Sequence, residues 1–421
     1  MVTNQCHQPV GVFSLENHSA EANDMESTIA FLSQGRLFVK ELGKSIREIE
    51  SRFANDAMER QAKDRNTNAW RARSGVWGNM GMAPPRWSQW EGEDAGDARR
   101  RIRFAGLARG SKPGTLLYVL DMENVNGLFE YDLNTDIEKR LIHRNGFVAR
   151  DLVCHPDCGE LAISISRDDG SSHLAVSDSE GRFWSHVAGG DSLDQMPSWI
   201  AGEGRKLVCQ SAAIGRNEAG YFRGLGPYAI ERFDLDHEGK VETVLVEDHN
   251  DLLQPMVLPD GSLLFIRRPY KPHGHQRVAP IEILKDICLF PFRLLRAIGY
   301  FLNFFSMMFS GKPLATTMGQ RQSAPQDRFL MLWGHMIDTK RALRQAERGT
   351  GEGLVPRDWQ LIRRTTDNTE VIVAENVLAY DRGPSGQLIY TNGTTIFALS
   401  GSGERTELCR DTMIEKIVCV S

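Results

Sequence analysis

Two cysteines, a histidine and an aspartate fall within the stretch Cys154-His155-Pro156-Asp157-Cys158, and such side chains can bind a metal ion. A structural zinc site needs further ligands at a matched spacing, and the rest of the sequence offers none. The stretch also has the same place in a repeated pattern as Leu258-Pro259-Asp260-Gly261, which has the composition of a tight turn. We therefore interpret it as a turn and predict neither a metal site nor a cofactor.

Other possible metal ligands have the same ordinary explanation. His273-Gly274-His275 lies in a predicted loop before an apolar stretch. Four aspartates could in principle hold calcium, but each lies in a predicted hairpin, where aspartate is a good turn residue. They are Asp132, Asp136, Asp234 and Asp236.

The familiar catalytic motifs are absent from the sequence. It contains no Gly-x-Ser-x-Gly nucleophile elbow, no phosphate-binding Gly-x-x-x-x-Gly-Lys-Ser/Thr loop and no His-Glu-x-x-His zinc motif. The net charge of −5 gives no general attraction to nucleic acid. With 41% hydrophobic and 25% charged residues, the composition is that of a globular protein. We predict a protein that is not an enzyme and binds no nucleic acid.

A strand–turn–strand unit organises the chain, and Leu252–Arg268 is its clearest copy. Pro259 suits the first corner of a tight turn, and Gly261 permits a positive φ. Related stretches are Ile102–Leu120, Asp151–Ser166, Gln195–Ala212 and Asn376–Asn392. Gly114, Gly159 and Gly204 follow one another at intervals of 45 residues, and Gly261 comes 57 residues later. Such a period, with four short strands per repeat, is typical of a β-propeller.

The two ends of the chain are predicted to complete one another. Residues 28–50 fit three strands, Ile29–Leu32, Arg36–Lys40 and Ile46–Glu50, which make a blade without its innermost strand. Met413–Val420 can supply that strand, and pairing the two ends would close the ring and leave no open sheet edge.

The sequence thus predicts an all-β, six-bladed propeller over residues 28–421, with four-stranded blades. The other blades are predicted at 101–143, at 147–188, at 193–246, from 251 with outer strands at Trp359–Arg364 and Glu370–Ala374, and at 376–408. Leu330–Ile337 fits either a further strand or the start of a helix. The alternative to a scaffold is an enzyme or small-ligand-binding protein with its site in the central channel.

The N-terminal part is predicted to differ from the blades. Residues 1–27 are interpreted as a disordered polar tail without a secretory signal, and the seven scattered cysteines favour a reducing compartment. Residues 51–100 form an insertion with a polar helix over 52–65 and a loop rich in tryptophan. Its tryptophans either pack across the propeller face or form a binding platform. They are Trp70, Trp77, Trp87 and Trp90.

A second insertion, 270–357, carries the segment 278–311, in which amphipathic helices are predicted over 280–310. On a helical projection, polar residues fall in one sector and apolar residues lie opposite, and Pro291 breaks or kinks the helix. The residues predicted to contact a membrane or a partner are Leu284, Ile287, Phe290, Leu294, Ile298, Phe301, Phe305, Arg293 and Arg296.

Three interpretations of this segment compete. A transmembrane span needs about 20 apolar residues, whereas the uncharged run 297–311 has 15. An in-plane helix, with aromatic side chains in the lipid and arginines at the headgroups, fits the pattern and is the interpretation we favour. Packing on the propeller flank or against a partner protein is the third.

The repeats resemble those of six-bladed TolB-type propellers over most of residues 28–50 and 101–420. The matching residues are His155-Pro156-Asp157 with Gly159, Leu258-Pro259-Asp260-Gly261 and, more loosely, Tyr380-Asp381 with Pro384-Ser385-Gly386. TolB itself is periplasmic and has an N-terminal α/β domain. This sequence shows neither an export signal nor room for that domain, so location and lipoprotein binding are not expected to carry over.

The chain also resembles a group of uncharacterised bacterial TolB-like propellers. The similar segments are Arg47–Ser51, Gly224–Tyr228, Phe265–Tyr270 and Phe290–Ala297. The resemblance implies a scaffold near MoxR-type ATPases and von Willebrand A-domain proteins. We therefore expect a cytoplasmic protein, peripheral to the inner membrane, with one of these proteins as its partner.

Overall fold

The computed structural model describes residues 28–60, 63, 102–271, 329–338 and 353–420, with short gaps at 42, 123–124, 146, 183, 188, 238–239, 333–334 and 401–402. Nearly all regular structure in these residues is β-strand, and the one helix among them covers residues 52–60. The chain divides into two compact units, Met1–Tyr270 with Arg341–Ser421, and Lys271–Lys340.

The smaller unit contains a β-hairpin. Strands β19 (Phe329–Leu332) and β20 (His335–Asp338) pair antiparallel and form a separate two-stranded sheet. The region expected to be either a strand or the start of a helix is therefore β-structure.

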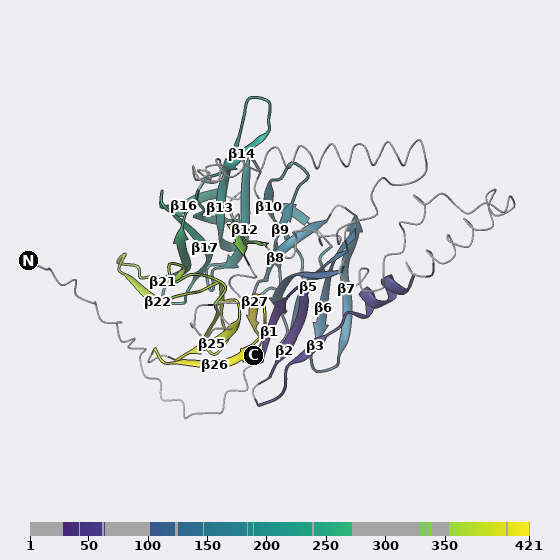
Figure 1. The fold of residues 1–421 in the computed structure, drawn as a ribbon. Coiled ribbons are helices and arrows are strands. Elements are labelled where there is room, and N and C mark those ends of the chain that lie inside the picture. Colours follow the sequence, from purple (N-terminus) through teal and green to yellow (C-terminus); the bar gives the residue numbers. More distant parts are fainter. Residues whose placement is uncertain are drawn as a thin grey trace, which may run out of the picture. The chain divides into compact units, whose positions relative to one another are not determined.

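The larger unit is built of antiparallel sheets (Figure 1). Four of them have four strands. The first comprises β27 (Ile414–Cys419), β1 (Ile29–Ser33), β2 (Arg36–Lys40) and β3 (Arg47–Ile49). The second comprises β4 (Arg103–Arg109), β5 (Thr115–Met122), β6 (Val125–Asp132) and β7 (Ile137–Asn145). The third comprises β17 (Asn250–Val257), β18 (Leu263–Pro269), β21 (Gln360–Arg364) and β22 (Glu370–Ala374), and the fourth comprises β23 (Ala379–Arg382), β24 (Leu388–Thr391), β25 (Thr395–Leu399) and β26 (Arg405–Arg410).

The remaining strands of the larger unit form a nine-stranded sheet in two antiparallel halves. The first half comprises β8 (Val148–Cys154), β9 (Leu161–Ser166), β10 (Ser172–Ser177) and β11 (Trp184–His186). The second comprises β12 (Ser192–Trp199), β13 (Lys206–Arg216), β14 (Phe222–Leu225), β15 (Ala229–Asp234) and β16 (Lys240–Leu245). The halves meet at one parallel pair, Ser172 opposite Leu193. Strand β14 was not predicted, because β13 runs on to Arg216 and turns back on itself before β15 begins.

The predicted turns have the expected backbone. Gly159 and Gly261 have φ values of 73° and 80°, in the left-handed region that glycine alone occupies readily. The Gly261 N–H donates to the Leu258 carbonyl at 2.9 Å, which closes the Pro-Asp-Gly turn. The repeated motif therefore marks hairpin turns, as the sequence predicted.

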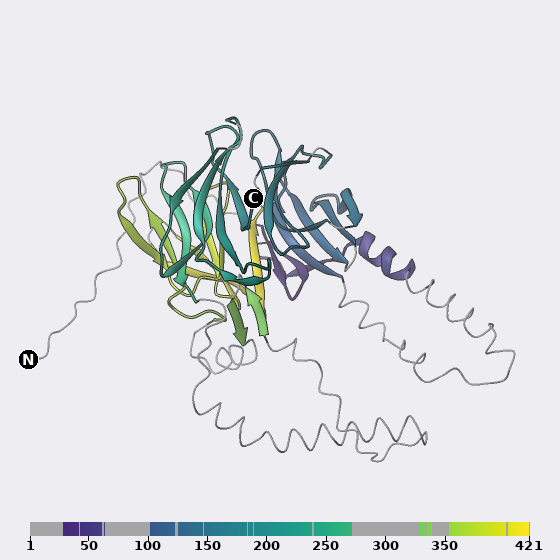
Figure 2. The same cartoon turned by 90° about the horizontal axis from the view of Figure 1, so that it is seen from above.

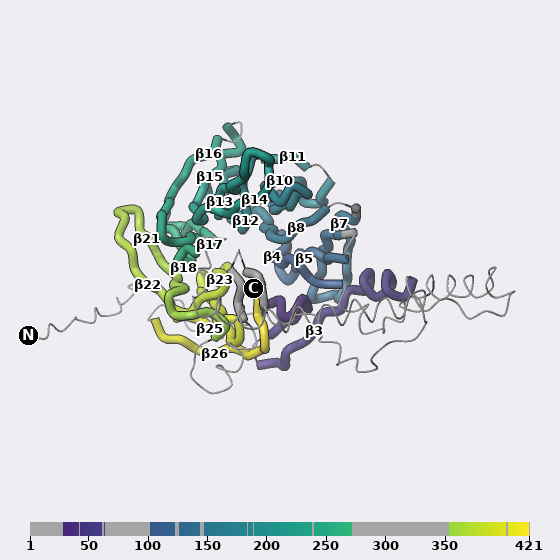
Figure 3. Tube along the Cα trace, turned by 45° about the horizontal axis from the view of Figure 1, so that its top comes forward, coloured from purple at the N-terminus to yellow at the C-terminus, as the bar shows by residue number. Residues whose placement is uncertain are grey.

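Seen along their common centre, the sheets form a ring, which is the arrangement of a β-propeller (Figure 3). Strands β4, β8, β12, β17 and β23 lie nearest the centre, and β3, β16, β22 and β26 lie at the rim. The ring closes where β27 pairs with β1, with Phe31 opposite Ile417 and Ile29 opposite Cys419. This pairing confirms that the last strand completes the first sheet; Figure 2 shows the same sheets from a second direction.

Apolar side chains fill the spaces between neighbouring sheets. Leu37 of β2 and Val418 of β27 share a core with Leu107 of β4 and Leu116 of β5, and all four side chains are buried. Corresponding clusters join the second sheet to β8–β10, β9 and β10 to β12 and β13, and β13 and β15 to the third sheet. Burial of these apolar side chains between neighbouring sheets stabilises the ring.

The predicted helix is confirmed over residues 52–60, and a partly buried polar cluster holds its start. The Ser51 hydroxyl accepts a hydrogen bond from the Ala54 N–H at 3.1 Å, as a helix N-cap does. Glu138 of β7 accepts hydrogen bonds from the Ser51 hydroxyl, the Phe53 N–H and the Tyr118 hydroxyl. The cap thereby fastens the helix to the second sheet.

Candidate functional site

Both sets of contact residues proposed from sequence lie outside the described residues. These are the four tryptophans Trp70, Trp77, Trp87 and Trp90, and the segment 278–311 with its apolar residues and arginines. The pair His273 and His275 lies outside them as well. Within the described part of the chain, no helix combines the length and apolar character needed to cross a membrane.

The Cys-His-Pro-Asp-Cys stretch is a turn, and both ring nitrogens of its histidine make hydrogen bonds. His155 Nδ1 accepts hydrogen bonds from the N–H groups of Asp157 and Cys158, at 3.1 and 3.3 Å. With Nδ1 accepting, Nε2 carries the proton and donates to the Gly204 carbonyl at 3.1 Å. The ring also packs edge-on against Trp199, with centroids 4.9 Å apart. His155 therefore joins two adjacent turns and has no nitrogen left for a metal.

The aspartates considered as calcium ligands also serve turns and ion pairs. Asp132 and Asp234 each accept a backbone N–H two residues ahead, at 2.8 and 3.1 Å. Asp136 pairs with Arg47 at 2.8 Å, and Asp236 accepts the Arg205 N–H. In the described ranges no three or more His, Cys, Asp or Glu side chains are grouped as a metal site requires.

Charged side chains gather instead on the innermost strands. Lys416 Nζ of β27 lies 3.4 Å from Asp151 Oδ1 of β8, although β4 runs between these strands. A side-chain pair that bridges two non-adjacent inner strands must lie on the central side of β4. Gly106 lets β4 approach β8 closely, because a Cβ there would stand 2.0 Å from the Arg150 carbonyl oxygen. We call Arg109, Asp151, Asp381 and Lys416 the axial polar cluster.

The Asp381 carboxyl of the axial polar cluster is buried, and burial changes its pKa. Its Oδ2 accepts the Cys419 N–H at 2.8 Å, which ties β23 to β27. Burial raises the pKa of Asp381 above its usual value, and the nearby Arg109 opposes that rise only in part. Arg109 in turn donates to the Arg382 carbonyl at 3.5 Å. The cluster therefore contains a carboxyl that keeps its proton to a higher pH than usual.

Glu415 precedes Lys416 on β27 and has a buried carboxyl oxygen without a hydrogen bond among the described residues. Its strand bulges there, because Ile414 pairs with Ser33 and Lys416 with Leu32, which leaves Glu415 without a cross-strand neighbour. Burial raises the pKa of Glu415, and Arg103 opposes the rise. Desolvation makes the ionised form of this side chain costly.

We expect the substitution Glu415→Gln to stabilise the protein at about pH 7 and to have little effect near pH 4. As the pH rises above about 4.3, the unfolded chain loses this proton before the folded protein does, and the folded state is penalised. Each unit by which the pKa is raised corresponds to about 1.4 kcal/mol at neutral pH. Thermal unfolding of both proteins at the two pH values measures the effect. Glu48→Gln, at an exposed ion pair with Arg36, is the control, and a lower midpoint for Glu415→Gln at pH 7 would contradict the prediction.

A second polar group lies buried between β10, β12 and β13. Asp194 accepts hydrogen bonds from the hydroxyls of Ser211 and Ser192, at 2.7 and 3.1 Å, and His173 Nδ1 stands 3.4 Å from it. In a catalytic triad the serine must face the other histidine nitrogen. Here His173 Nε2 has no partner among the described residues, and the side chain is 1% exposed. The arrangement therefore holds strands together and offers no accessible nucleophile.

Four of the five described thiols are unsuited to nucleophilic chemistry. Cys154, Cys158, Cys209, Cys409 and Cys419 are all free, and the last three are buried. Burial raises the pKa of Cys154 and of Cys409 to about 11, so that little thiolate exists at neutral pH.

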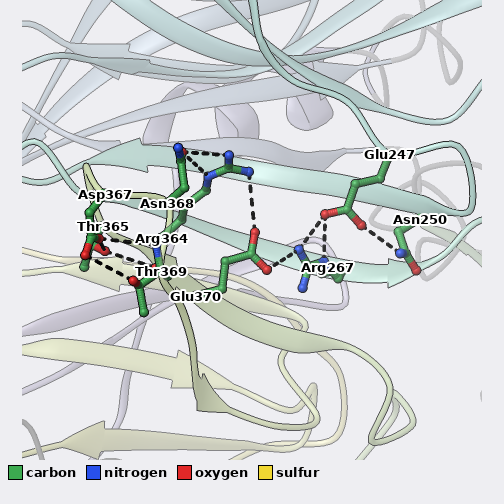
Figure 4. Close-up of polar contacts among 9 residues, drawn as sticks. All are labelled: Glu247, Asn250, Arg267, Arg364, Thr365, Asp367, Asn368, Thr369 and Glu370. Carbon is green, nitrogen blue, oxygen red and sulfur yellow. Dashed lines mark hydrogen bonds and ion pairs between the residues drawn. The ribbon is translucent and has the colours of Figure 1, made fainter.

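The third sheet carries a chain of ion pairs near its outer edge (Figure 4). Arg267 of β18 contacts both Glu247, which precedes β17, and Glu370 of β22; its distance to Glu370 is 2.7 Å. Arg364 of β21 lies 3.5 Å from Glu370 and donates to Asn368 at 2.8 Å. Because these charges pair with one another across three strands, the network braces the sheet and needs no ligand.

Large apolar side chains are exposed on the outer strands and on one hairpin. They are Ile46, Ile137, Tyr221, Phe222, Val241, Val244, Val246 and Ile372. Tyr221 and Phe222 lie at the turn into β14, and the three valines lie on or directly after β16. Single exposed apolar side chains are common on protein surfaces, so those that follow one another closely, as on β16, are the candidates for a contact surface.

Comparison with known proteins finds only solved structures of low sequence identity. No family model and no curated protein matches the chain. Among solved structures, TolB from Acinetobacter baumannii is 10% identical with a TM-score of 0.49, over 94% of this chain and 67% of that chain. A putative TolB from Agrobacterium tumefaciens is 13% identical, with a TM-score of 0.41, over 75% of this chain and 83% of that chain. An oligogalacturonate lyase in complex with manganese is also 13% identical, with a TM-score of 0.37, over 73% and 65% of the two chains. The assignment as a β-propeller therefore rests on the sheets and their packing.

Proposed function

We propose that this chain is a six-bladed propeller that serves as a non-catalytic protein-interaction scaffold. Six blades result if each half of the nine-stranded sheet is one blade, with β14 as an excursion from the second. The observation that carries the proposal is the contrast between centre and rim. The axial polar cluster makes its hydrogen bonds and ion pairs largely within the ring, whereas exposed apolar side chains lie on outer strands and on the β14 hairpin.

The scaffold is proposed to lie on the cytoplasmic face of a membrane, held by the segment 278–311. Its amphipathic sequence supports this placement. A MoxR-type ATPase or a von Willebrand A-domain protein is the proposed partner, and the sequence resemblance supports this choice.

Replacing residues 278–311 by a Gly/Ser linker of equal length is expected to move the protein from the membrane fraction to the soluble fraction. The roots of the insertion stay intact, because Arg268 of β18 and Trp359 before β21 are buried within the larger unit. Circular dichroism and thermal unfolding of the variant check that the propeller remains folded. Unchanged membrane recovery would refute the anchor.

A pull-down in mild detergent tests the scaffold itself. The intact protein and the linker variant are compared, each purified under the same conditions. If the intact protein retains no partner, the proposed function is wrong. Partners retained by both proteins would locate the binding surface on the propeller rather than on the insertion.

A second candidate function is a small-ligand or enzymatic site at the centre of the ring. The raised pKa values of Asp381 and Glu415 favour it, because buried carboxyls that keep a proton can act as general acids. A ligand that raises the unfolding temperature of the wild type but not of Asp381→Asn would support this candidate over the first.

A further inference from the structure

In the described part of the chain, the outermost strand of each sheet pairs on one side only, and several of these edges are protected. Proteins avoid accidental pairing by keeping edge strands short or placing charges on them. Strands β3 and β11 have three residues each. Strand β7 carries Lys139 and Arg140, and β26 carries Arg405, Glu407 and Arg410.

Strand β16 has six residues and carries two charges, Lys240 and Glu242, together with exposed apolar side chains. Its residues from Lys240 to Val244 are all exposed, so neither face of the strand is covered by the described residues. Val241, Val244 and the following Val246 are 47%, 44% and 57% exposed. The strand pairs with β15 on one side, and in the described part of the chain no strand pairs with its other edge (Figure 3).

A shared β-bulge shows how β16 differs from its counterparts. Four outer strands contain one extra residue, and in each case it is apolar: Leu141 in β7, Val244 in β16, Val373 in β22 and Leu408 in β26. The other three are partly buried, and Leu141 and Leu408 pack against the cores between sheets. Only Val244 of the four is exposed. The exposed apolar side chains of β16 therefore do not contribute to the cores between sheets as Leu141 and Leu408 do.

Exposed acidic side chains lie on and after this strand. The segment from Ala229 to His249 contains seven acidic and two basic residues, of which Asp234 pairs with Lys206 and Glu247 with Arg267. Arg232 already pairs with Glu203, and Glu242 and Asp248 are exposed. A basic partner would be attracted here, and an acidic one repelled.

We propose that β16 is a docking edge for an extended, basic segment of a partner protein, which adds to the sheet as a further strand. Backbone hydrogen bonds would hold the segment, its apolar side chains would cover Val241 and Val244, and its basic side chains would face Glu242 and Asp248. The inference rests on the scaffold function proposed above and specifies the chemistry of the partner.

A peptide of eight alternating lysine and valine residues, blocked at both ends, is the probe. We expect it to bind the full-length protein with a Kd in the range of about 1–100 μM by fluorescence anisotropy. The same peptide with alternate amides N-methylated cannot donate to the edge and should not bind. A glutamate–valine peptide tests the role of charge. No binding of the lysine–valine peptide at about 1 mM, or equal binding of the N-methylated peptide, would overturn the proposal.

Substitution locates the site. The double variant Val241→Lys, Val244→Lys should weaken peptide binding about tenfold or more, because it removes apolar contact and adds repulsion. Ile137→Lys, at an equally exposed position of β7, should leave binding unchanged. If sedimentation shows a wild-type dimer that the double variant abolishes, a second copy occupies the edge and the proposal is wrong. Partners retained by the double variant in the pull-down would refute the docking edge while leaving the scaffold function in place.

Discussion

Asp251→Ala should destabilise the protein by about 3–5 kcal/mol, because it leaves the charge of Arg268 buried without its counterion. The two side chains are 3% and 0% exposed, with Arg268 Nε 2.9 Å from Asp251 Oδ2. Burial lowers the pKa of Arg268, and Asp251 opposes that effect. The other carboxylate oxygen accepts the Tyr228 N–H at 3.0 Å, so the substitution also removes the acceptor of a buried backbone donor.

Urea unfolding of wild type and variant measures this effect. Glu48→Ala breaks the exposed pair with Arg36 and should cost less than about 1 kcal/mol. The double variant Asp251→Ala, Arg268→Met should recover part of the loss, since it removes the isolated charge. If the double variant is less stable than Asp251→Ala by the full cost of a second substitution, the pair is not coupled and the explanation fails.

The burial of Arg268 could not be predicted from the sequence. Arg267 and Arg268 stand together at the end of a predicted strand, and alternation places them on opposite faces. One joins the ion-pair network of Figure 4, whereas the other is buried against the ring of Trp359, 4.8 Å away. Which of the two arginines is buried depends on how the neighbouring sheet packs, and the local sequence contains no information on that packing.

The parts of the fold that were predicted correctly depend on short-range chemistry. Glycines at turns need a positive φ, and Gly159, Gly204 and Gly261 all adopt it. The repeat of these turns then predicted four strands from one turn to the next, which holds between Gly114 and Gly159 and between Gly159 and Gly204. Strand β14 was missed because its hairpin is short and carries polar residues around Gly220, which read as an ordinary loop.

The axial polar cluster was missed although the sequence contains a signal for it. Three inner strands carry adjacent residues of opposite charge within an apolar run: Arg150-Asp151, Asp381-Arg382 and Glu415-Lys416. When each strand is considered alone, two adjacent charged residues suggest that the strand lies at the edge of a sheet, exposed to solvent. Only the ring places Lys416 beside Asp151, which are 265 residues apart in the sequence. The tryptophan loop and the segment 278–311 stay predictions, since both lie outside the described residues.

Removing residues 413–421 is expected to abolish cooperative folding of the larger unit. Strand β27 contributes Ile414, Ile417, Val418 and Cys419, all 6% exposed or less, to the cores on both sides of the first sheet. Burying each large apolar side chain is worth about 1.5–3 kcal/mol, so their loss approaches the whole stability of a typical domain, about 5–15 kcal/mol. The truncated ring would also expose the edge of β1, which favours aggregation.

A synthetic peptide that covers residues 412–421 provides the decisive measurement. Added to the truncated protein, it should restore the near-ultraviolet circular dichroism and the unfolding transition, because β27 pairs with β1 through residues that the peptide contains. The same peptide with Ile417→Asp places a charge opposite Phe31 in the core and should not restore them. If the truncated protein unfolds with the wild-type midpoint, the ring does not depend on its last strand. The fold would then be held by the interfaces between neighbouring sheets alone, and closure would be a consequence of the propeller rather than a condition for it.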